Sequence, residues 1–135
     1  MSIDDIRSDF TLLDDWEDRY RYVIELGRGL PPLDDAFKTE ATKVRGCASQ
    51  VWLVARNTPA GLSFLGDSDA HIVRGLVAIL LAAIEGKSAA EILATDVPGI
   101  FAELGLEENL TPQRSNGVAS MIRRVKADAA AVVAG

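Results

Sequence analysis

The sequence predicts an α+β fold in which helices pack on one face of a small antiparallel sheet. Apolar residues recur with helical spacing in the first 30 residues and again after residue 67. The stretch between them is rich in β-branched and aromatic residues and contains a Thr-Pro-Ala-Gly turn, a combination typical of a hairpin. The length of 135 residues suits one domain, so we expect residues 1–135 to form a single domain.

Two helices are expected before residue 30. Ser2 marks the start of the first helix, whose apolar residues continue to Leu13. Asp15 caps the second helix, and Gly27 ends it. Two successive prolines at positions 31 and 32 then interrupt the helical pattern, and a loop follows to about residue 40.

The middle of the chain predicts a small antiparallel sheet. Residues 50–56 read Gln-Val-Trp-Leu-Val-Ala-Arg, which is the composition of a strand and too short for an independent helix. Residues 62–65 form the partner strand after the turn at residues 58–61. A further short strand over residues 42–45 would complete the sheet.

Helical patterns return after the hairpin. The Asp-Ser-Asp side chains at residues 67–69 can cap a helix that runs to Ile84 and stops near Gly86. A Ser-x-x-Glu capping box at Ser88 begins a short helix, and a brief helical turn follows the Asp-Val-Pro-Gly sequence further along. Thr111 is followed directly by a proline and starts the last helix.

Composition excludes several classes of protein. Hydrophobic residues make up 48% and charged residues 25% of the chain, as in ordinary globular domains. A single cysteine cannot form an internal disulfide, so a disulfide-stapled secreted fold is excluded. One cysteine and one histidine also exclude a Cys/His zinc or iron–sulfur site within one chain. Composition alone leaves open a metal site built from carboxylates.

Charge and hydropathy narrow the partners. The net charge is −6, and residues 1–40 hold 11 acidic and 5 basic residues. The one tight basic cluster, Arg123, Arg124 and Lys126, is too small to follow a phosphate backbone, so we expect no nucleic-acid partner. The longest apolar run has 10 residues, whereas a membrane span needs about 20. With an acidic start and no signal-peptide pattern, we expect a cytoplasmic protein that does not bind membranes.

Cys47 is the residue whose surroundings suggest chemistry. A free cysteine is most often a small buried hydrophobe. Here small neighbours, including Gly46 and Ser49, place it in a loop tip between two predicted strands, where we expect it to be accessible. Lys43 and Arg45 are close in sequence and would favour the thiolate. A single thiol with no base beside it suits sulfur transfer better than peptide hydrolysis.

Several motifs follow one another along the chain: Trp16-Glu17-x-x-Tyr20, Val44-x-Gly46-Cys47-x-Ser49-x-Val51-Trp52-Leu53, Gly66-Asp67-Ser68-Asp69-Ala70, and Leu110-Thr111-Pro112-x-Arg114-Ser115-x-Gly117. In this order and spacing they resemble the SufE family, the sulfur acceptors that work with cysteine desulfurases. The resemblance covers nearly the whole chain. It includes the closely similar CsdE proteins, which these motifs do not separate from SufE.

The resemblance implies both a fold and a mechanism. The fold is a small curved antiparallel sheet flanked by helices, similar to iron–sulfur scaffold proteins of the IscU type. In the mechanism, Cys47 takes persulfide sulfur from a SufS-type cysteine desulfurase, stimulates that enzyme, and relays the sulfur to a SufBCD-like cluster scaffold. Pyridoxal phosphate belongs to the desulfurase, so no cofactor and no metal are expected on this chain. A homodimer is a further possibility.

Residues around Cys47 are the candidates for positioning its loop or contacting the partner: Arg45, Gly46, Ser49, Asp69 and Arg114. Arg114 has the competing interpretation of an ordinary surface arginine. Asp69 is better explained as a stabiliser of a helix terminus than as a contact. The remaining patterned residues have structural explanations.

Two glycines, Gly75 and Gly117, fall inside predicted helices, where close helix packing is the favoured reason and room for the cysteine loop the second. We expect Val51 and Trp52 in the core and His71 on the surface.

Three other functions compete with sulfur relay. A cluster scaffold needs several cysteine ligands, which one chain with one cysteine does not supply. A thiol redox sensor would share Cys47 but would explain none of the Arg114 or Gly75 patterns, and in a binding module the cysteine would be incidental. Within sulfur relay, a CsdE-type acceptor could serve a different sulfur pathway. A persulfide is best shielded until its acceptor arrives, so burial of Cys47 at rest would require the loop to move.

Overall fold

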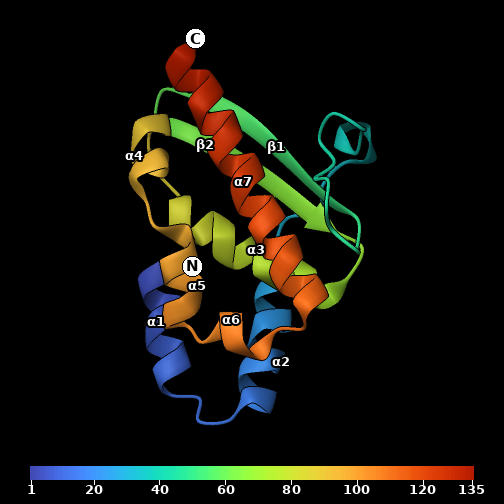
Figure 1. The fold of residues 1–135 in the computed structure, drawn as a ribbon, viewed down its shortest axis with the longest axis vertical. Helices are drawn as coiled ribbons and strands as arrows, with labels where there is room; N and C mark the ends of the chain where they lie inside the picture. The colour runs from blue at the N-terminus through green and yellow to red at the C-terminus, as the bar shows by residue number, and fades with distance from the viewer.

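The computed structural model describes residues 1–135 and confirms the α+β class (Figure 1). Two strands lie between two N-terminal and five C-terminal helices. The elements in order are α1 (Ile3–Thr11), α2 (Trp16–Arg28), a 3₁₀ turn (Asp35–Phe37), β1 (Val51–Thr58), β2 (Gly61–Ser68), α3 (His71–Ile84), α4 (Ala89–Ala94), α5 (Val97–Glu103), α6 (Leu106–Asn109) and α7 (Pro112–Ala134).

β1 and β2 form an antiparallel hairpin with Val51 opposite Ser68 and Thr58 opposite Gly61. The expected third strand is reduced to one isolated bridge between Lys43 and Trp52. Two backbone hydrogen bonds flank that bridge, at 2.8 Å and 2.9 Å, and the chain then leaves the sheet into the Cys47 loop. A ladder of three residues is too short to count as a strand, although it still widens the sheet beside β1.

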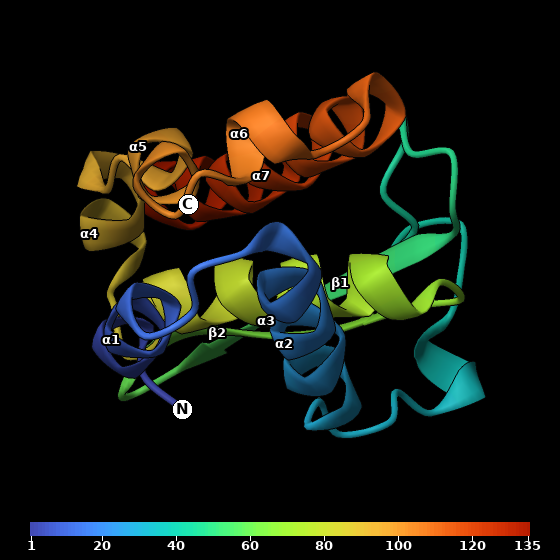
Figure 2. The same ribbon diagram turned by 90° about the horizontal axis from the view of Figure 1, so that it is seen from below.

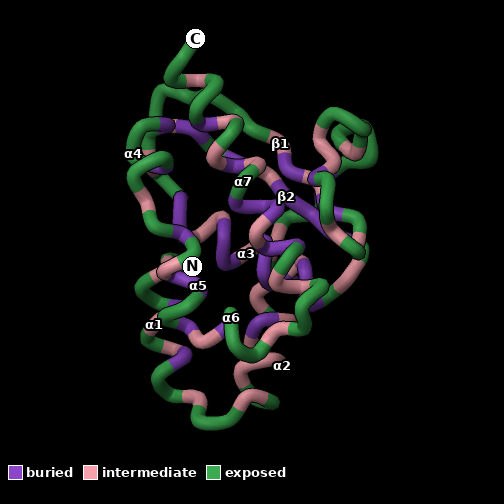
Figure 3. Tube along the Cα trace, viewed as in Figure 1, coloured by how far each residue is buried: buried purple, intermediate pink, exposed green.

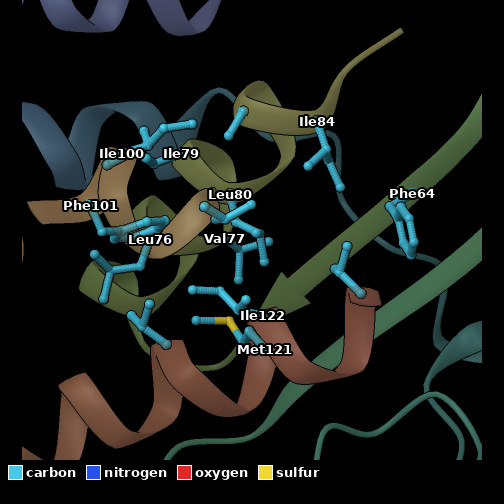
Figure 4. Close-up of a cluster of buried hydrophobic side chains, with 14 of the residues drawn as sticks. Phe64, Leu76, Val77, Ile79, Leu80, Ile84, Ile100, Phe101, Met121 and Ile122 are labelled. Atoms are coloured by element: carbon cyan, nitrogen blue, oxygen red, sulfur yellow. The ribbon is translucent and has the colours of Figure 1, made fainter. Parts of the chain in front are cut away.

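Helix α3 is the centre of the core. It is apolar on nearly all sides, which is the pattern of a helix buried among other elements. It contacts α2 and β2, while α7 contacts β1 and α4. Figure 2 shows α4 to α7 together on one side of the molecule, opposite the hairpin. In Figure 3 the buried segments run along α3 and the inner parts of the strands. Figure 4 shows side chains of α3 packed with those of α5 and α7: Leu76, Val77, Ile79, Leu80, Ile100, Phe101, Met121 and Ile122.

Local capping signals in the sequence are confirmed. Ser2 and Ser88 each form a capping box with the acidic residue three positions later. The Thr111 hydroxyl accepts a hydrogen bond of 3.3 Å from the Arg114 backbone N–H, and Pro112 occupies the first turn of α7. None of the helices is long and apolar enough to cross a membrane.

The predicted end of the second helix is wrong. Gly27 lies inside α2, which continues to Arg28. A Cβ atom on Gly27 would lie 2.6 Å from the backbone nitrogen of Gly75, so this glycine allows α2 and α3 to cross closely. Gly75 has the same role on α3, because a Cβ there would lie 2.7 Å from the carbonyl carbon of Val23 and closer still to its oxygen. Close helix packing is therefore confirmed as the reason for Gly75.

The predicted capping of the long helix is also wrong. Asp67 and Ser68 are the last residues of β2, and α3 begins at His71 without a side-chain cap. The Asp67 carboxylate is buried and lies 3.0 Å from the Arg74 guanidinium and 3.5 Å from the Lys38 ammonium. Because its partners come from two other segments, this ion-pair cluster fixes the loop before β1 and the start of α3 to the end of the sheet.

Candidate active site around Cys47

The Cys47 loop connects Val44 to Val51 at one end of the sheet, on the α7 side. Gly46 has φ +88°, in the left-handed region that favours glycine. A Cβ on Gly46 would also lie 2.6 Å from the Ser120 hydroxyl of α7. The turn predicted at Gly46 is therefore confirmed, and the loop lies close against α7.

Side chains hold both ends of this loop. At the first end, Arg124 of α7 donates hydrogen bonds to the backbone oxygens of Ala41 (2.6 Å) and Lys43 (3.3 Å). At the second end, the Asp69 carboxylate accepts a hydrogen bond of 3.0 Å from the Gln50 N–H, and the Ser68 hydroxyl donates one of 2.7 Å to the Gln50 oxygen.

Asp69 therefore does not cap the helix that it precedes, as the sequence suggested. It holds the Cys47 loop instead, so it acts as a contact after all.

The Cys47 thiol points toward α7 rather than outward. The residue is half-buried, and its Sγ donates a hydrogen bond of 3.6 Å to the backbone oxygen of Gly117. A Cβ on Gly117 would lie 3.7 Å from Sγ, which is an ordinary contact distance, and it would meet no other atom from outside its own stretch of helix within 4 Å. The second explanation offered for Gly117, room for the cysteine loop, therefore fits the structure, because the missing side chain leaves space beside Sγ. The sequence predicted that Cys47 would be accessible at a loop tip. This prediction is wrong for the conformation seen here, in which the residue is half-buried.

Burial raises the pKa of the Cys47 thiol, and the positive charge of Arg123 opposes this shift only in part. The thiol is therefore protonated at neutral pH in this conformation. The residues that the sequence predicted to favour the thiolate, Lys43 and Arg45, do not lower this pKa. Arg45 is exposed and pairs with Glu40 at 3.3 Å. Arg123 lies six residues after Gly117 on α7, and sequence reasoning missed it because its closeness depends on how the helix packs against the loop.

A cavity of about 230 Å³ opens beside Cys47. Val73, Leu76 and Met121 are its apolar residues from α3 and α7. The remaining lining residues come from the loop and from the start of α7: Ala48, Ser49, Thr111, Gln113, Arg114 and Gly117. The structure thus brings Cys47, Ser49 and Arg114 to one cavity, while Arg45 lies outside its lining.

Arg114 is not an ordinary surface arginine. Its guanidinium donates a hydrogen bond to the Tyr20 hydroxyl of α2 and lies 5.7 Å from the centre of the Tyr20 ring. It forms no ion pair with a carboxylate, in contrast to Arg45. Tyr20 therefore holds a positively charged group at the Cys47 cavity from a residue 94 positions away in the chain.

Two other expectations can be compared with the structure. Trp52 is only half-buried, on the face of the sheet away from Leu53, where the Lys38 ammonium lies 5.1 Å from its ring centre. Val51 is completely buried and His71 is exposed, as predicted. A larger cavity, about 570 Å³, lies between α2, β2 and α3; its lining is mainly apolar and contains no cysteine.

Known proteins resemble this chain over nearly its full length. A family profile described as the SufE Fe-S metabolism associated domain matches residues 4–129. This chain belongs to the SufE family. An uncharacterized SufE-like protein of Rhizobium etli is 58% identical over 132 residues, which cover 95% of this chain and 89% of the relative.

Two further relatives of this SufE family member are informative. The sulfur acceptor protein CsdE of Escherichia coli is 47% identical over 116 residues, covering 84% of this chain and 78% of CsdE. A solution structure of a hypothetical protein from Thermus thermophilus superposes with a TM-score of 0.79 at 22% identity and full coverage of both chains. The last similarity shows that the fold is shared.

Proposed function

We propose that this SufE family protein is a sulfur acceptor for iron–sulfur cluster assembly. Cys47 takes sulfur from the persulfide of a SufS-type cysteine desulfurase, stimulates that enzyme, and passes the sulfur to a SufBCD-like scaffold. The observation that carries this proposal is a single thiol directed into a small cavity, within a chain that is 47% identical to a named sulfur acceptor. We further propose that the chain works as one domain in the cytoplasm.

The reaction requires little besides a thiolate and access to it. The Cys47 thiolate attacks the terminal sulfur of the donor persulfide, a new S–S bond forms, and the donor's S–S bond breaks. The donor cysteine leaves as a thiolate, and the proton of Cys47 is lost to solvent before the attack. No oxidant is consumed, because the sulfane sulfur only changes carrier.

The resting conformation supports a protected carrier. The raised pKa of Cys47 keeps the thiol protonated, so it reacts slowly with stray electrophiles. After loading, the added sulfur would lie in the cavity beside Gly117 and the apolar residues of α3 and α7. Transfer itself requires the loop to move outward, where the thiol regains water and its pKa falls.

The candidate residues have distinct roles in this proposal. Gly46 provides the turn that directs Cys47 toward α7, and Asp69 holds the loop through Gln50. Arg114 positions the start of α7 and the cavity opening. Arg45 is exposed beside the loop and is available to the desulfurase. Ser49 lines the cavity next to the thiol.

A redox-sensor function is less well supported. Sensor cysteines are exposed and have a low pKa, whereas Cys47 is half-buried with a raised pKa. A CsdE-type role in another sulfur pathway uses the same Cys47 chemistry and differs only in the protein that receives the sulfur.

The deciding experiment is the intact mass of the protein after incubation with a cysteine desulfurase and free cysteine. We expect one or more added sulfur atoms, about 32 Da each, which a reductant removes. Cys47→Ser should gain none and should no longer stimulate the desulfurase. An unmodified wild-type mass with an active desulfurase would overturn sulfur relay and favour an incidental cysteine.

A further inference from the structure

We propose that the Cys47 cavity also accepts sulfur directly from small anionic sulfane donors, of which thiosulfate is the simplest, without a protein donor. This inference rests on the proposed persulfide chemistry of Cys47 and extends it to a class of small-molecule substrate. Three observations carry it: the size of the cavity, the unpaired charge of Arg114, and the direction of the thiol.

The cavity is larger than a persulfide requires. Its volume of about 230 Å³ is several times the roughly 30 Å³ that one water molecule occupies in the liquid. It is also below the range of about 300–1,000 Å³ that is typical of pockets for drug-sized ligands. The space therefore suits a molecule of a few heavy atoms better than a nucleotide.

The charge at the cavity favours an anion. One guanidinium nitrogen of Arg114 donates to the Tyr20 hydroxyl, and the other two donate to no protein acceptor. A guanidinium has a planar fork of donors that matches the oxygens of a sulfonate or carboxylate. Tyr20 restricts the Arg114 side chain, so less rotamer freedom is lost when an anion binds.

Six of the ten arginines of this acidic chain pair with a carboxylate, whereas Arg114 does not. Arg45 pairs with Glu40 and Arg124 pairs with Asp128. Arg123, whose charge acts on the thiol, also lacks a carboxylate partner and donates only to the Ser120 hydroxyl, at 3.0 Å. Arg114, which lines the cavity, and Arg123, whose charge acts on the thiol, thus both lack a carboxylate partner in a protein with a net charge of −6. This distribution attracts anions to the one place where the nucleophile lies.

The proposed reaction is balanced without a further reactant. The Cys47 thiolate attacks the outer sulfur of thiosulfate, a Cys47 S–S bond forms, and the S–S bond of thiosulfate breaks. Sulfite leaves with the electron pair of that bond, and the proton that the thiol lost on forming the thiolate goes to solvent, from which the sulfite can take up a proton. The sulfane sulfur moves from one carrier to another, so neither partner needs an external oxidant or reductant.

The test compares two sulfur sources on the same protein by intact mass. With millimolar thiosulfate alone, we expect a gain of about 32 Da on Cys47 together with one equivalent of released sulfite. Arg114→Gln should slow this loading by about tenfold or more, because a tenfold change corresponds to about 1.4 kcal/mol and the loss of a charge-assisted hydrogen bond costs at least about that much. Arg21→Gln is the matched control, since Arg21 is an exposed arginine on α2 that pairs with Glu17 and lies outside the cavity lining. It should load at the wild-type rate.

A second measurement isolates the charge selectivity from sulfur transfer. An anionic and a cationic methanethiosulfonate reagent of similar size both react with thiols, and their rate ratio, divided by the same ratio for a small free thiol, reports the local potential. We expect this normalised ratio of anionic to cationic rate to exceed one for wild-type Cys47, and Arg114→Gln to lower it. A normalised ratio of one or less in the wild-type protein would overturn the anion preference.

The two sulfur sources separate the inference from the proposed function. Loading by a desulfurase without loading by thiosulfate would overturn the small-donor inference and leave sulfur relay standing. Loading by thiosulfate without loading by any desulfurase would support the inference and contradict the relay. Absence of loading from both sources would overturn both.

Discussion

The α2–α3 crossing and the Cys47 loop each place a helical glycine against a neighbouring segment, but the two contacts differ in kind. At the crossing, Gly75 lies against the backbone of Val23, and a Cβ atom would overlap it. At the loop, Gly117 lies against Cys47, and a Cβ atom would meet Sγ at an ordinary 3.7 Å. In the sequence both are glycines inside helices, each unfavourable by about 1 kcal/mol relative to alanine.

This difference separates stability from function. Backbone atoms cannot move aside without shifting a whole helix, so the fold requires glycine at position 75. Packing does not require the space beside Gly117, since the one atom from another segment near this position is the reactive sulfur of Cys47. The helix does not need a glycine at position 117. Its place next to the single thiol of the chain is better explained by the extra sulfur that we propose Cys47 to carry.

Gly75→Ala is expected to have the largest effect on stability, and it tests the difference between the two glycines most directly. Because the methyl group would collide with the Val23 backbone, we expect the free energy of unfolding to fall by about 3 kcal/mol or more. Urea denaturation followed by circular dichroism measures this change. A loss below about 1 kcal/mol would show that α2 and α3 separate easily and that the two glycines are equivalent.

Gly117→Ala is the matched substitution at the loop. Here we expect unfolding stability to stay the same or to rise by up to about 1 kcal/mol, because alanine favours the helix and its methyl group has room. Sulfur loading of Cys47 should nevertheless slow, since the methyl group takes space beside Sγ. Urea denaturation and intact mass, measured on one preparation, test the expected stability and the expected slower loading together. A destabilised variant with normal loading would show that Gly117 serves packing and not sulfur transfer.

The smallest expected effect concerns the pKa of Cys47. Burial holds this pKa above its ordinary value, so alkylation by iodoacetamide should accelerate with pH through and beyond the usual thiol range. Arg123→Ala removes the charge that favours the thiolate, so the pKa of Cys47 should rise further and alkylation at pH 8 should slow. Arg45→Ala should leave the profile unchanged, because that charge is exposed and paired with Glu40.

Features set by neighbouring residues could be predicted from the sequence. The caps at Ser2, Ser88 and Thr111, the hairpin turn and the last helix all depend on contacts within four residues. Cys47 was also identifiable, because small residues surround it and the motifs on both sides resemble a known family.

The errors arose where a distant segment decides the outcome. Gly27 looked like a helix stop, and only its contact with α3 shows why the helix continues through it. Asp69 looked like a helix cap, but the Gln50 N–H in the Cys47 loop competes for its carboxylate. Arg123 acts on Cys47 only because α7 packs beside the loop, a relation that no local pattern in the sequence contains.

The two clamps on the Cys47 loop also set a limit on distance. Val44 is fixed to β1, and Gln50 is fixed by Asp69 and Ser68, so only five residues between them are free to extend. Cys47 is three residues from each anchor, and an extended chain spans at most about 3.5 Å per residue. The Cα atom of Cys47 therefore lies no further than about 10 Å from either anchor, and the thiol reaches only one short side chain beyond it. A protein that exchanges sulfur with Cys47 must therefore bring its own reacting sulfur within this distance, on a protruding or mobile segment.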